Sequence, residues 1–398
     1  MPFLNASVRR GTARVARGSE LRYEIARTAR EWSALAVQWN ELLEESRANC
    51  VFLTWEWQDT WRSLQERDGD LLTICIRGPR GELLGIAPFH KVDYTLAGAV
   101  PYRVLRMAGE VDCGGEYLTW IAPRSCEQQV SAEIVRALRA LRSEWDLIWM
   151  PKLPSWSGAH QPMIEAMQAG GLTLNKRANS FTSIALPQDY ASYLALMSAN
   201  RRQQVRRMSH KILSRPAVEV RRVRSSAELG PALEALFRLH NERWSAAGGQ
   251  GVFARNPKEK AFYERFAPKA LAAGWLALYV LLDCGEPKAV QLGYVYDSTF
   301  VQLQEGFDPN YSPHAGNVLR ARVIEDCIRS RLREYDFLAG VSEHKRRWLG
   351  RQRVGMDLLV GAPHWKTLPI MRLGLWPTGA YLRPRSPRLA GEAGADQG

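Results

Sequence analysis

Between residues 275 and 348, the hydrophobic positions first follow the pattern of β-strands and then the period of an α-helix. The runs WLALYVLLD, AVQLGYVYD and FVQLQEGFD are strand-like and are separated by very short turns, which predicts an antiparallel meander. The next segment, NVLRARVIEDCIRSRLR, has helical periodicity and precedes a short apolar run at residues 335–338. A connection of that length predicts a crossover to a parallel strand.

A sheet that changes from antiparallel to parallel pairing can splay open at the change. The helix that follows points its free N–H groups into the gap, which suits a phosphate-bearing ligand. Gly316 and Asn317 lie at the expected start of this helix, and a residue without Cβ allows close approach of a phosphate. An ordinary loop-to-helix junction is the alternative interpretation, and one glycine does not decide between them.

The first half of the chain repeats the pattern of the second without sharing its sequence. Both halves show two helices, three strands, a helix, a strand, a helix and a strand. The chain is therefore predicted to be an α/β protein of two similar lobes, each a mixed, mostly antiparallel sheet flanked by helices. We expect a basic disordered head at residues 1–24, lobes at 25–175 and 176–362, and a loose Pro-, Gly- and Arg-rich tail at 363–398.

The charge balance of the 398-residue chain is basic, with 54 Lys and Arg against 41 Asp and Glu, which gives a net charge of +13. A charge of that size indicates anionic partners: nucleic acid, anionic lipid or phosphorylated small molecules. Nucleic acid is disfavoured because no helix-turn-helix, zinc-finger or RNP-type signature accompanies the charge. The six cysteines have no zinc spacing, so no metal is expected.

The sequence contains no run that approaches the roughly 18 apolar residues of a membrane span and no apolar leader after Arg9 and Arg10. We therefore expect a cytoplasmic protein. Its basic faces leave open a peripheral contact with the membrane.

Charged residues flank the expected phosphate loop. Glu305 ends a strand and could act as a general base towards an amine or hydroxyl. Asp308 is a second candidate carboxylate, although its position before a proline also suits a turn. His314 could contact a phosphate or be a solvated loop residue. Lys345 could place its ammonium on a phosphate or on a developing oxyanion, or could belong to a solvated helix end.

The segment 201–214 predicts a helix with one apolar face and one basic face that includes Arg206. The basic face could simply be solvated, or it could form a rim that recruits an anionic substrate. His240 falls at the same helical angle as Leu229, Leu233 and Leu236, so we interpret it as a core histidine.

Several segments resemble the BioF2-like or CelD-like acetyltransferase family, a branch of the GNAT superfamily related to the Fem-type aminoacyl transferases. The resemblance covers about residues 25–350 and is carried by these words: FLTWEWQDTW from 52, SFTSIALPQDYASYL from 180, NRRQQVRR from 200, LFRLHNERW from 236, GFDPNYSPHAGNVL from 306 and YDFLAGVSEHKRRW from 335.

This resemblance implies acyl transfer, with acetyl as the expected group, from an acyl-CoA to an amine or hydroxyl. The acceptor would be an anionic or sugar-containing molecule, such as a cell-envelope or exopolysaccharide precursor. Carried over by position, Gly316, Asn317 and Val318 would contact the cofactor pyrophosphate beside His314. The same comparison implies substrate contacts by Arg201, Arg206, Trp244 and Trp348, with Lys345 beside them.

The chain departs from the usual GNAT pattern in two ways, because only Gly316 remains of the two spaced loop glycines and no tyrosine follows the last core strand. The first half lacks a comparable loop, so we expect it to shape the substrate without catalysing the reaction. Two alternatives remain: a Fem-like transferase that uses charged tRNA, and a catalytically inactive scaffold for envelope-polymer assembly. A long inserted helical hairpin would favour the tRNA-dependent enzyme, and the sequence shows none.

Overall fold

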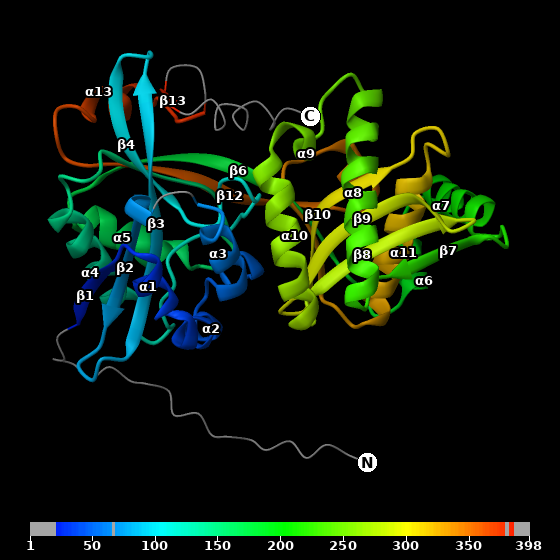
Figure 1. Cartoon of the computed structure of the whole chain (residues 1–398), viewed down its shortest axis with the longest axis horizontal. Coiled ribbons are helices and arrows are strands. Elements are labelled where there is room, and N and C mark those ends of the chain that lie inside the picture. The colour runs from blue at the N-terminus through cyan, green and yellow to red at the C-terminus, as the bar shows by residue number, and fades with distance from the viewer. Residues whose placement is uncertain (1–20, 66–67, 379–381, 386–398) are drawn as a thin grey trace.

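The strands of this protein form one continuous sheet that runs through two lobes (Figure 1). A computed structural model describes residues 21–65, 68–378 and 382–385, and thirteen strands of this part of the chain belong to the sheet. The strand order is β1-β2-β3-β4-β5-β12-β6-β11-β10-β9-β8-β7, with β13 paired to β3. Most neighbours are antiparallel, so the predicted α/β architecture of two lobes with mixed, mostly antiparallel pairing is confirmed.

The N-terminal lobe begins at β1 and ends with the helix after β5. Its elements are β1 (Arg22–Ala26), α1 (Ala29–Ser33), α2 (Ala36–Glu45), η1 (Val51–Leu53), α3 (Trp55–Arg62), η2 (Asp68–Asp70), β2 (Leu71–Arg77), β3 (Leu83–Leu96), β4 (Val100–Met107), α4 (Glu127–Ala140), β5 (Leu147–Leu153) and α5 (His160–Ala169). Thr28 starts α1 with a capping box, because its side chain and that of Glu31 each accept from the other's backbone N–H.

The C-terminal lobe begins with two helices and repeats this order from β7 onward. Its elements are α6 (Tyr190–Ala195), α7 (Ala199–Leu213), β7 (Val218–Arg222), α8 (Ser226–Ala246), α9 (Val252–Arg255), α10 (Pro257–Ala272), β8 (Leu276–Asp283), β9 (Glu286–Tyr296), β10 (Thr299–Phe307), α11 (Ala315–Arg329), β11 (Glu334–Ala339) and α12 (Glu343–Arg347). The expected meander is confirmed, because β8 pairs with β9 and β9 with β10, both antiparallel. The capping box of Ser225 with Glu228 at the start of α8 is also present.

Two central strands join the lobes. β12 (Arg351–Gly361) follows the C-terminal lobe in sequence, yet it lies between β5 and β6 and pairs antiparallel with both. β6 (Thr173–Ala185) pairs with β12 along its length and with β11 at its end. The N-terminal lobe is therefore joined through β12 and the C-terminal lobe through β6, and β6 itself crosses the expected lobe boundary at residues 175–176.

Each lobe contains one short parallel pairing at its crossover. β10 and β11 pair only from residues 299–301 to 334–336, and α11 connects them as predicted. β4 and β5 pair only at residues 104–105 and 147–148, with α4 as the connection. Beyond these residues the strands separate, so each lobe has a splayed strand pair.

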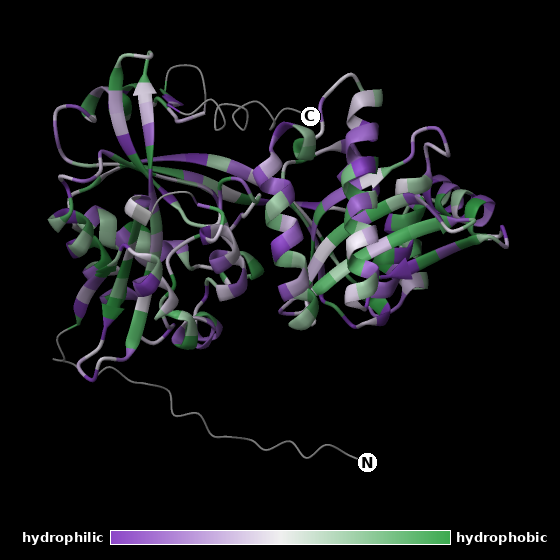
Figure 2. Cartoon of the chain, in the orientation of Figure 1, coloured by the Kyte–Doolittle hydropathy of each residue, from purple (hydrophilic) through white to green (hydrophobic). Residues whose placement is uncertain are grey.

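The two faces of the sheet carry separate hydrophobic clusters. One cluster packs α8, α10 and the helices of the N-terminal lobe against one face and includes Trp57, Phe262 and Leu292. The other places α6, α7 and α11 on the opposite face of the C-terminal lobe and includes Phe300 and Tyr335. Figure 2 shows hydrophobic colours along β8 and β9 beneath α8.

The ends of the chain differ in part from the prediction. Residues 1–20 of the expected head lie outside the described residues, whereas residues 22–24 form part of β1. The tail was expected to be loose, and this is wrong for its described part. α13 (Leu368–Leu373) packs against β6 and β12, and β13 (Leu382–Pro384) pairs with β3, because the tail carries apolar side chains that fill a cluster on the N-terminal lobe.

Candidate active site

The splay of the C-terminal lobe begins after Val301 of β10 and Asp336 of β11, the last pair in register. Each strand bulges just beyond this point. Leu338 has a φ of +62°, a conformation that is strained for a leucine, and its N–H donates to Asp336 Oδ1 at 2.8 Å. The carboxylate of Asp336 therefore fixes the bulge that turns β11 away from β10.

Glu305 of β10 lies within the splay and is held from both faces of the sheet. Its carboxylate forms an ion pair with Arg243 of α8 at 2.9 Å and another with Arg320 of α11. Burial alone would raise the pKa of Glu305, but the two guanidinium groups outweigh it and lower this pKa to about 2. A carboxylate that acidic is a weak base at neutral pH, so the structure argues against Glu305 as the general base.

Arg320 and His344 belong to the same polar cluster, and the sequence did not single out either residue for the site. The Arg320 side chain is 2% exposed and contacts the imidazole Nε2 of His344 as well as Glu305. Partial burial and the neighbouring Arg320 lower the pKa of His344 to about 4, so its imidazole is neutral at pH 7. An arginine on the buried side of a predicted helix was the signal that could have identified this cluster.

Lys345 is held by the backbone of β11 and the turn after it. Its Nζ donates to the carbonyl oxygens of Phe337 at 3.1 Å, Ala339 at 2.5 Å and Gly340 at 3.0 Å. These three acceptors use all three hydrogens of the ammonium group. Lys345 therefore fixes the end of the strand in this structure, and its contact with an oxyanion or phosphate stays a prediction.

Asp308 adopts the turn role that its neighbour Pro309 suggested. Its Oδ1 accepts from the N–H groups of Asn310 at 2.9 Å and Tyr311 at 3.2 Å, and its Oδ2 lies 3.5 Å from Lys288 Nζ. Both carboxylate oxygens of Asp308 therefore contact the turn and Lys288, which gives the residue a structural function.

The start of α11 lies where the sequence predicts a phosphate loop. His314 is the N-cap residue but its side chain makes no capping hydrogen bond, and Gly316 and Asn317 follow in the first turn. Val318 is buried and its N–H already donates to the His314 carbonyl at 2.9 Å. The first backbone N–H groups of a helix have no partner within the helix, so those of residues 316 and 317 can bind an anion.

A basic pocket lies beside this helix start. It has a volume of about 510 Å³ and is lined by Met197, Ser198, Asn200, Arg201, Gln204, Arg346, Arg347 and Leu349. The Arg201 guanidinium lies 4.9 Å from the centre of the Trp348 ring, and Trp348 Nε1 donates to Asn317 Oδ1 at 3.4 Å. This chain of contacts connects the pocket to the first turn of α11.

The other residues predicted to contact substrate do not line the basic pocket. Trp348 is fully buried and supports Arg201, and its direct contact with substrate stays a prediction. Arg206 is exposed on α7 and is not among the residues that line the basic pocket. Trp244 is 44% exposed near the end of α8 and lies close to His240. His240 is a core histidine as predicted, because it is 5% exposed and hydrogen bonded to the Glu305 carbonyl.

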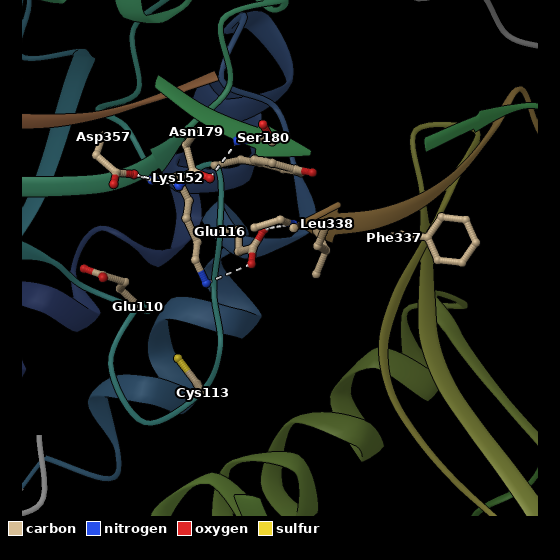
Figure 3. A network of polar contacts seen from close by, with 12 residues as sticks. Glu110, Cys113, Glu116, Lys152, Asn179, Ser180, Phe337, Leu338 and Asp357 are labelled. Carbon is tan, nitrogen blue, oxygen red and sulfur yellow. Dashed lines mark hydrogen bonds and ion pairs between the residues drawn. The ribbon is translucent and has the colours of Figure 1, made fainter. Parts of the chain in front are cut away.

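A polar network joins the two lobes at the end of β11. The buried carboxylate of Glu116 lies 3.1 Å from Lys152 Nζ and accepts from the N–H of Ala339 at 2.8 Å. Asp357 accepts from the N–H of Lys152 at 2.9 Å. Figure 3 shows Glu116 between Lys152 and the strand that carries Leu338. The network ties the bulged strand of one lobe to that of the other.

The described residues were also considered as metal ligands and as membrane spans. Within residues 21–65, 68–378 and 382–385, no group of three or more His, Cys, Asp or Glu side chains could hold a metal ion. None of the helices in the part of the chain described above is both long and apolar enough to cross a membrane.

The strand order, the crossover helix and the splayed strand pair confirm the GNAT-like fold expected of the C-terminal lobe. Residues 199–346, which lie within this lobe, match the family model described as an acetyltransferase (GNAT) domain. The whole chain has a two-lobed fold similar to that of FemX, with 10% identity and a TM-score of 0.56 over 81% of this chain and 95% of that one.

Two other solved structures have weaker similarity. One is the C-terminal domain of a putative lysylphosphatidylglycerol synthetase from Agrobacterium fabrum, with 8% identity and a TM-score of 0.49 over 84% of this chain and 96% of that one. The other is a tandem GNAT protein from the clavulanic acid biosynthesis pathway, with 10% identity and a TM-score of 0.43 over 87% of this chain and 100% of that one. At these identities the similarities concern the fold alone. A search among curated proteins found no significant match.

Proposed function

We propose that the C-terminal lobe transfers an acyl group from an acyl-CoA to an amine or hydroxyl acceptor. The observation that carries this proposal is the uncapped start of α11, which lies at the open end of the splay and beside the basic pocket. Coenzyme A carries several phosphate groups, and a helix N-terminus next to arginines suits such a ligand.

Different parts of the site would bind the pyrophosphate and the thioester of the acyl-CoA. The N–H groups of Gly316 and Asn317 would receive the pyrophosphate, and Arg201, Arg346 and Arg347 would balance its charge. The thioester would lie where β10 and β11 separate. Because a thioester is already activated, aligning it with the acceptor provides much of the rate, and no covalent nucleophile is required.

The finer parts of this proposal rest on the resemblance to the BioF2-like or CelD-like family. They are an acetyl donor, an acceptor that is a sugar-containing or anionic envelope precursor, and a cytoplasmic location with peripheral membrane contact. We also propose that the N-terminal lobe, residues 25–175, shapes the acceptor site and that residues 176–362 carry the chemistry.

The tRNA-dependent alternative receives less support from the fold. α8 and α10 are the long helices inserted between β7 and β8, and both pack on the body of the protein. Figure 1 shows α8 lying across β8 and β9. Within the described residues, these helices therefore do not project as a separate hairpin.

Thermal-shift titration of the full chain separates the candidate donors. We expect acetyl-CoA or a longer acyl-CoA to raise the melting temperature, by an amount equivalent to about 2.7 kcal/mol at 100 times Kd, and tRNA to leave it unchanged. Arg346→Gln should weaken acyl-CoA binding about fivefold, because it removes about 1 kcal/mol of charge interaction. Arg206→Gln is the matched control on the exposed face of α7 and should bind normally.

The proposal is wrong if no CoA thioester stabilises the wild-type chain. Stabilisation by tRNA alone would favour the Fem-like alternative, and binding of an anionic polymer without any donor would favour the scaffold.

A further inference from the structure

A second pocket lies between the two lobes, on the face of the sheet opposite α11. It has a volume of about 130 Å³ and needs both halves of the chain. Asn49, Tyr117 and Trp156 line it from the N-terminal lobe, and Val301 and Asp336 line it from β10 and β11. We call this space the interlobe pocket.

The interlobe pocket and the start of α11 lie across the splayed strands from each other. Phe300 and Tyr335 belong to the cluster that packs on α11, whereas their neighbours Val301 and Asp336 line the pocket. Successive side chains of a strand point to opposite faces, which explains this division. Because the strands separate directly after Val301 and Asp336, a group in the pocket can meet a thioester that enters from the α11 side.

Asp336 is the carboxylate at this meeting point. It is 3% exposed, and its Oδ2 accepts from the Tyr117 hydroxyl at 2.9 Å and lies 3.2 Å from Nη2 of Arg353. Burial raises the pKa of Asp336 to about 6, although Arg353 opposes the rise. Burial and the Asp336 charge also raise the pKa of Tyr117 well above its usual value, so the phenol stays protonated and keeps donating.

This environment distinguishes Asp336 from Glu305, the other carboxylate near the splay. The pKa of Glu305 is about 2, which leaves it with little affinity for a proton at neutral pH. A carboxylate with a pKa of about 6 is close to the operating pH, which is where general-base catalysis is most efficient. Asp336 is also the residue that fixes the bulge of β11, so its position relative to the splay is well defined.

The walls of the pocket combine aromatic rings with hydrogen-bonding groups. The Trp156 ring is 39% exposed and lies 5.4 Å from Tyr117 in an edge contact, with the Arg353 guanidinium 4.1 Å from its centre. Tyr296 donates its hydroxyl hydrogen to Asn49 Oδ1 at 2.8 Å at the same pocket. Such walls suit a small ring that bears hydroxyl or amino groups.

We infer that the interlobe pocket binds the acceptor, a hydroxyl- or amino-bearing ring, and that Asp336 accepts the proton of its attacking group. The inference rests on the proposed acyl transfer. The nitrogen or oxygen of the acceptor forms a bond to the thioester carbon, and the carbon–sulfur bond breaks. The acceptor proton passes to Asp336 and then to the departing thiolate, so the products are acylated acceptor and free CoA thiol. Tyr117 is a positioning residue that orients the carboxylate.

The test uses the full chain with acetyl-CoA and four probe acceptors: D-glucosamine, methyl glucoside, putrescine and ethanolamine. We expect a ring probe to raise the melting temperature of the wild type and to promote thiol release, with the open-chain probes weaker in both measurements. Trp156→Ala should reduce the effect of the ring probes while acetyl-CoA binding persists. If acetyl-CoA binds but no ring probe stabilises the chain or releases thiol, the acceptor assignment is wrong and the proposed donor stands.

The role of Asp336 is tested by the pH dependence of thiol release. Asp336→Asn should lower kcat by about 100-fold or more without changing acetyl-CoA binding. Tyr117→Phe removes a hydrogen bond that favours the charged carboxylate, so the pKa of Asp336 should rise and the acid limb of the kcat profile should move to higher pH.

Asp357→Asn is the matched control, because Asp357 is equally buried and accepts from the N–H of the bulged residue Lys152 in the other lobe. It should affect stability without moving the pH profile. A wild-type rate in folded Asp336→Asn, or an unmoved acid limb in Tyr117→Phe, would overturn the assignment of Asp336. Absence of acetyl-CoA binding to the wild type would instead remove the proposed function itself.

Discussion

The splayed strand pairs of the two lobes have the same strand order, but the loops beside them are held by different contacts. In the N-terminal lobe the loop after β4 is closed, because the carbonyl oxygens of Ala108, Gly109 and Val111 accept from three side chains of α3. Those donors are Gln58, Trp57 and Trp61, and their distances are 2.9, 2.9 and 3.0 Å. In the C-terminal lobe, the loop after β10 is held by its own turn at Asp308 and by Arg215, which donates to the Tyr311 hydroxyl at 2.8 Å, and no side chain caps the start of α11.

The helix starts differ in charge as well. The first turn of α4 contains Glu127, whose carboxylate already lies at the positive end of the helix dipole and 3.5 Å from Arg47. A pocket of about 350 Å³ beside α4 has Glu127 and Glu165 next to its arginines. The corresponding turn of α11 contains no acidic residue and is connected through Trp348 to a pocket that three arginines line. Because both lobes share the strand plan, anion binding at the start of α11 would depend on these few residues and not on the fold.

The largest effect is expected from the charge cluster that distinguishes the C-terminal splay. Arg320→Met leaves Glu305 buried with Arg243 as its remaining ion-pair partner, and breaking a buried ion pair costs about 3–5 kcal/mol. Chemical denaturation at pH 7 measures this loss. Arg322→Met is the control on the same helix, because Arg322 is 44% exposed and its change should stay within about 0.5 kcal/mol.

The same variant has a defined pH signature. The folded pKa of Glu305 lies below its unfolded value, so its stabilisation is present above pH 4.5 and is lost as the pH falls towards 2. Without Arg320 the pKa of Glu305 rises, and the acid transition should begin at higher pH. Equal acid transitions in wild type and Arg320→Met would contradict the ion-pair explanation.

A smaller effect is expected from blocking the open helix start. A Cβ at Gly316 would lie 3.2 Å from Phe307, and the branches of a valine would cover the N–H groups beside it. Gly316→Val should therefore weaken acyl-CoA binding at least about tenfold, or about 1.4 kcal/mol, as measured by titration calorimetry.

Gln128→Val places a valine at the second position of α4 and should leave CoA binding unaltered. Normal CoA affinity in Gly316→Val, with circular dichroism showing a folded chain, would mean that the phosphate site lies elsewhere.

Local patterns explain which parts of the fold the sequence could predict. The meander and the crossover helix were predicted because their periodicities lie within about 60 consecutive residues. The pairing of β12 with β6 joins residues such as Gln352 and Thr182, and no local pattern specifies such a distant register. The described tail was misjudged because its few apolar residues, such as Ile370 and Leu382, become buried only against the N-terminal lobe.

The site shows the same division between local and distant information. Gly316 could be located because it follows a strand and opens a helix. The three carbonyl groups that hold Lys345 could not be predicted, since their positions depend on the path of the backbone. Asp336 was passed over as part of an apolar strand. A single carboxylate between Tyr335 and Phe337 was nevertheless the available signal, because strand alternation places it on the other face.

The smallest effect is expected from placing a negative charge in the first turn of α11, where α4 already has Glu127. Asn317→Asp keeps an acceptor for Trp348 Nε1 and adds a negative charge in the first turn. It should stabilise the helix by about 0.3–1 kcal/mol and weaken acyl-CoA binding about threefold to fivefold. The reverse change, Glu127→Gln, should leave CoA binding unaltered. Thermal unfolding and calorimetry measure both quantities, and tighter CoA binding by Asn317→Asp would contradict the contrast between the two helix starts.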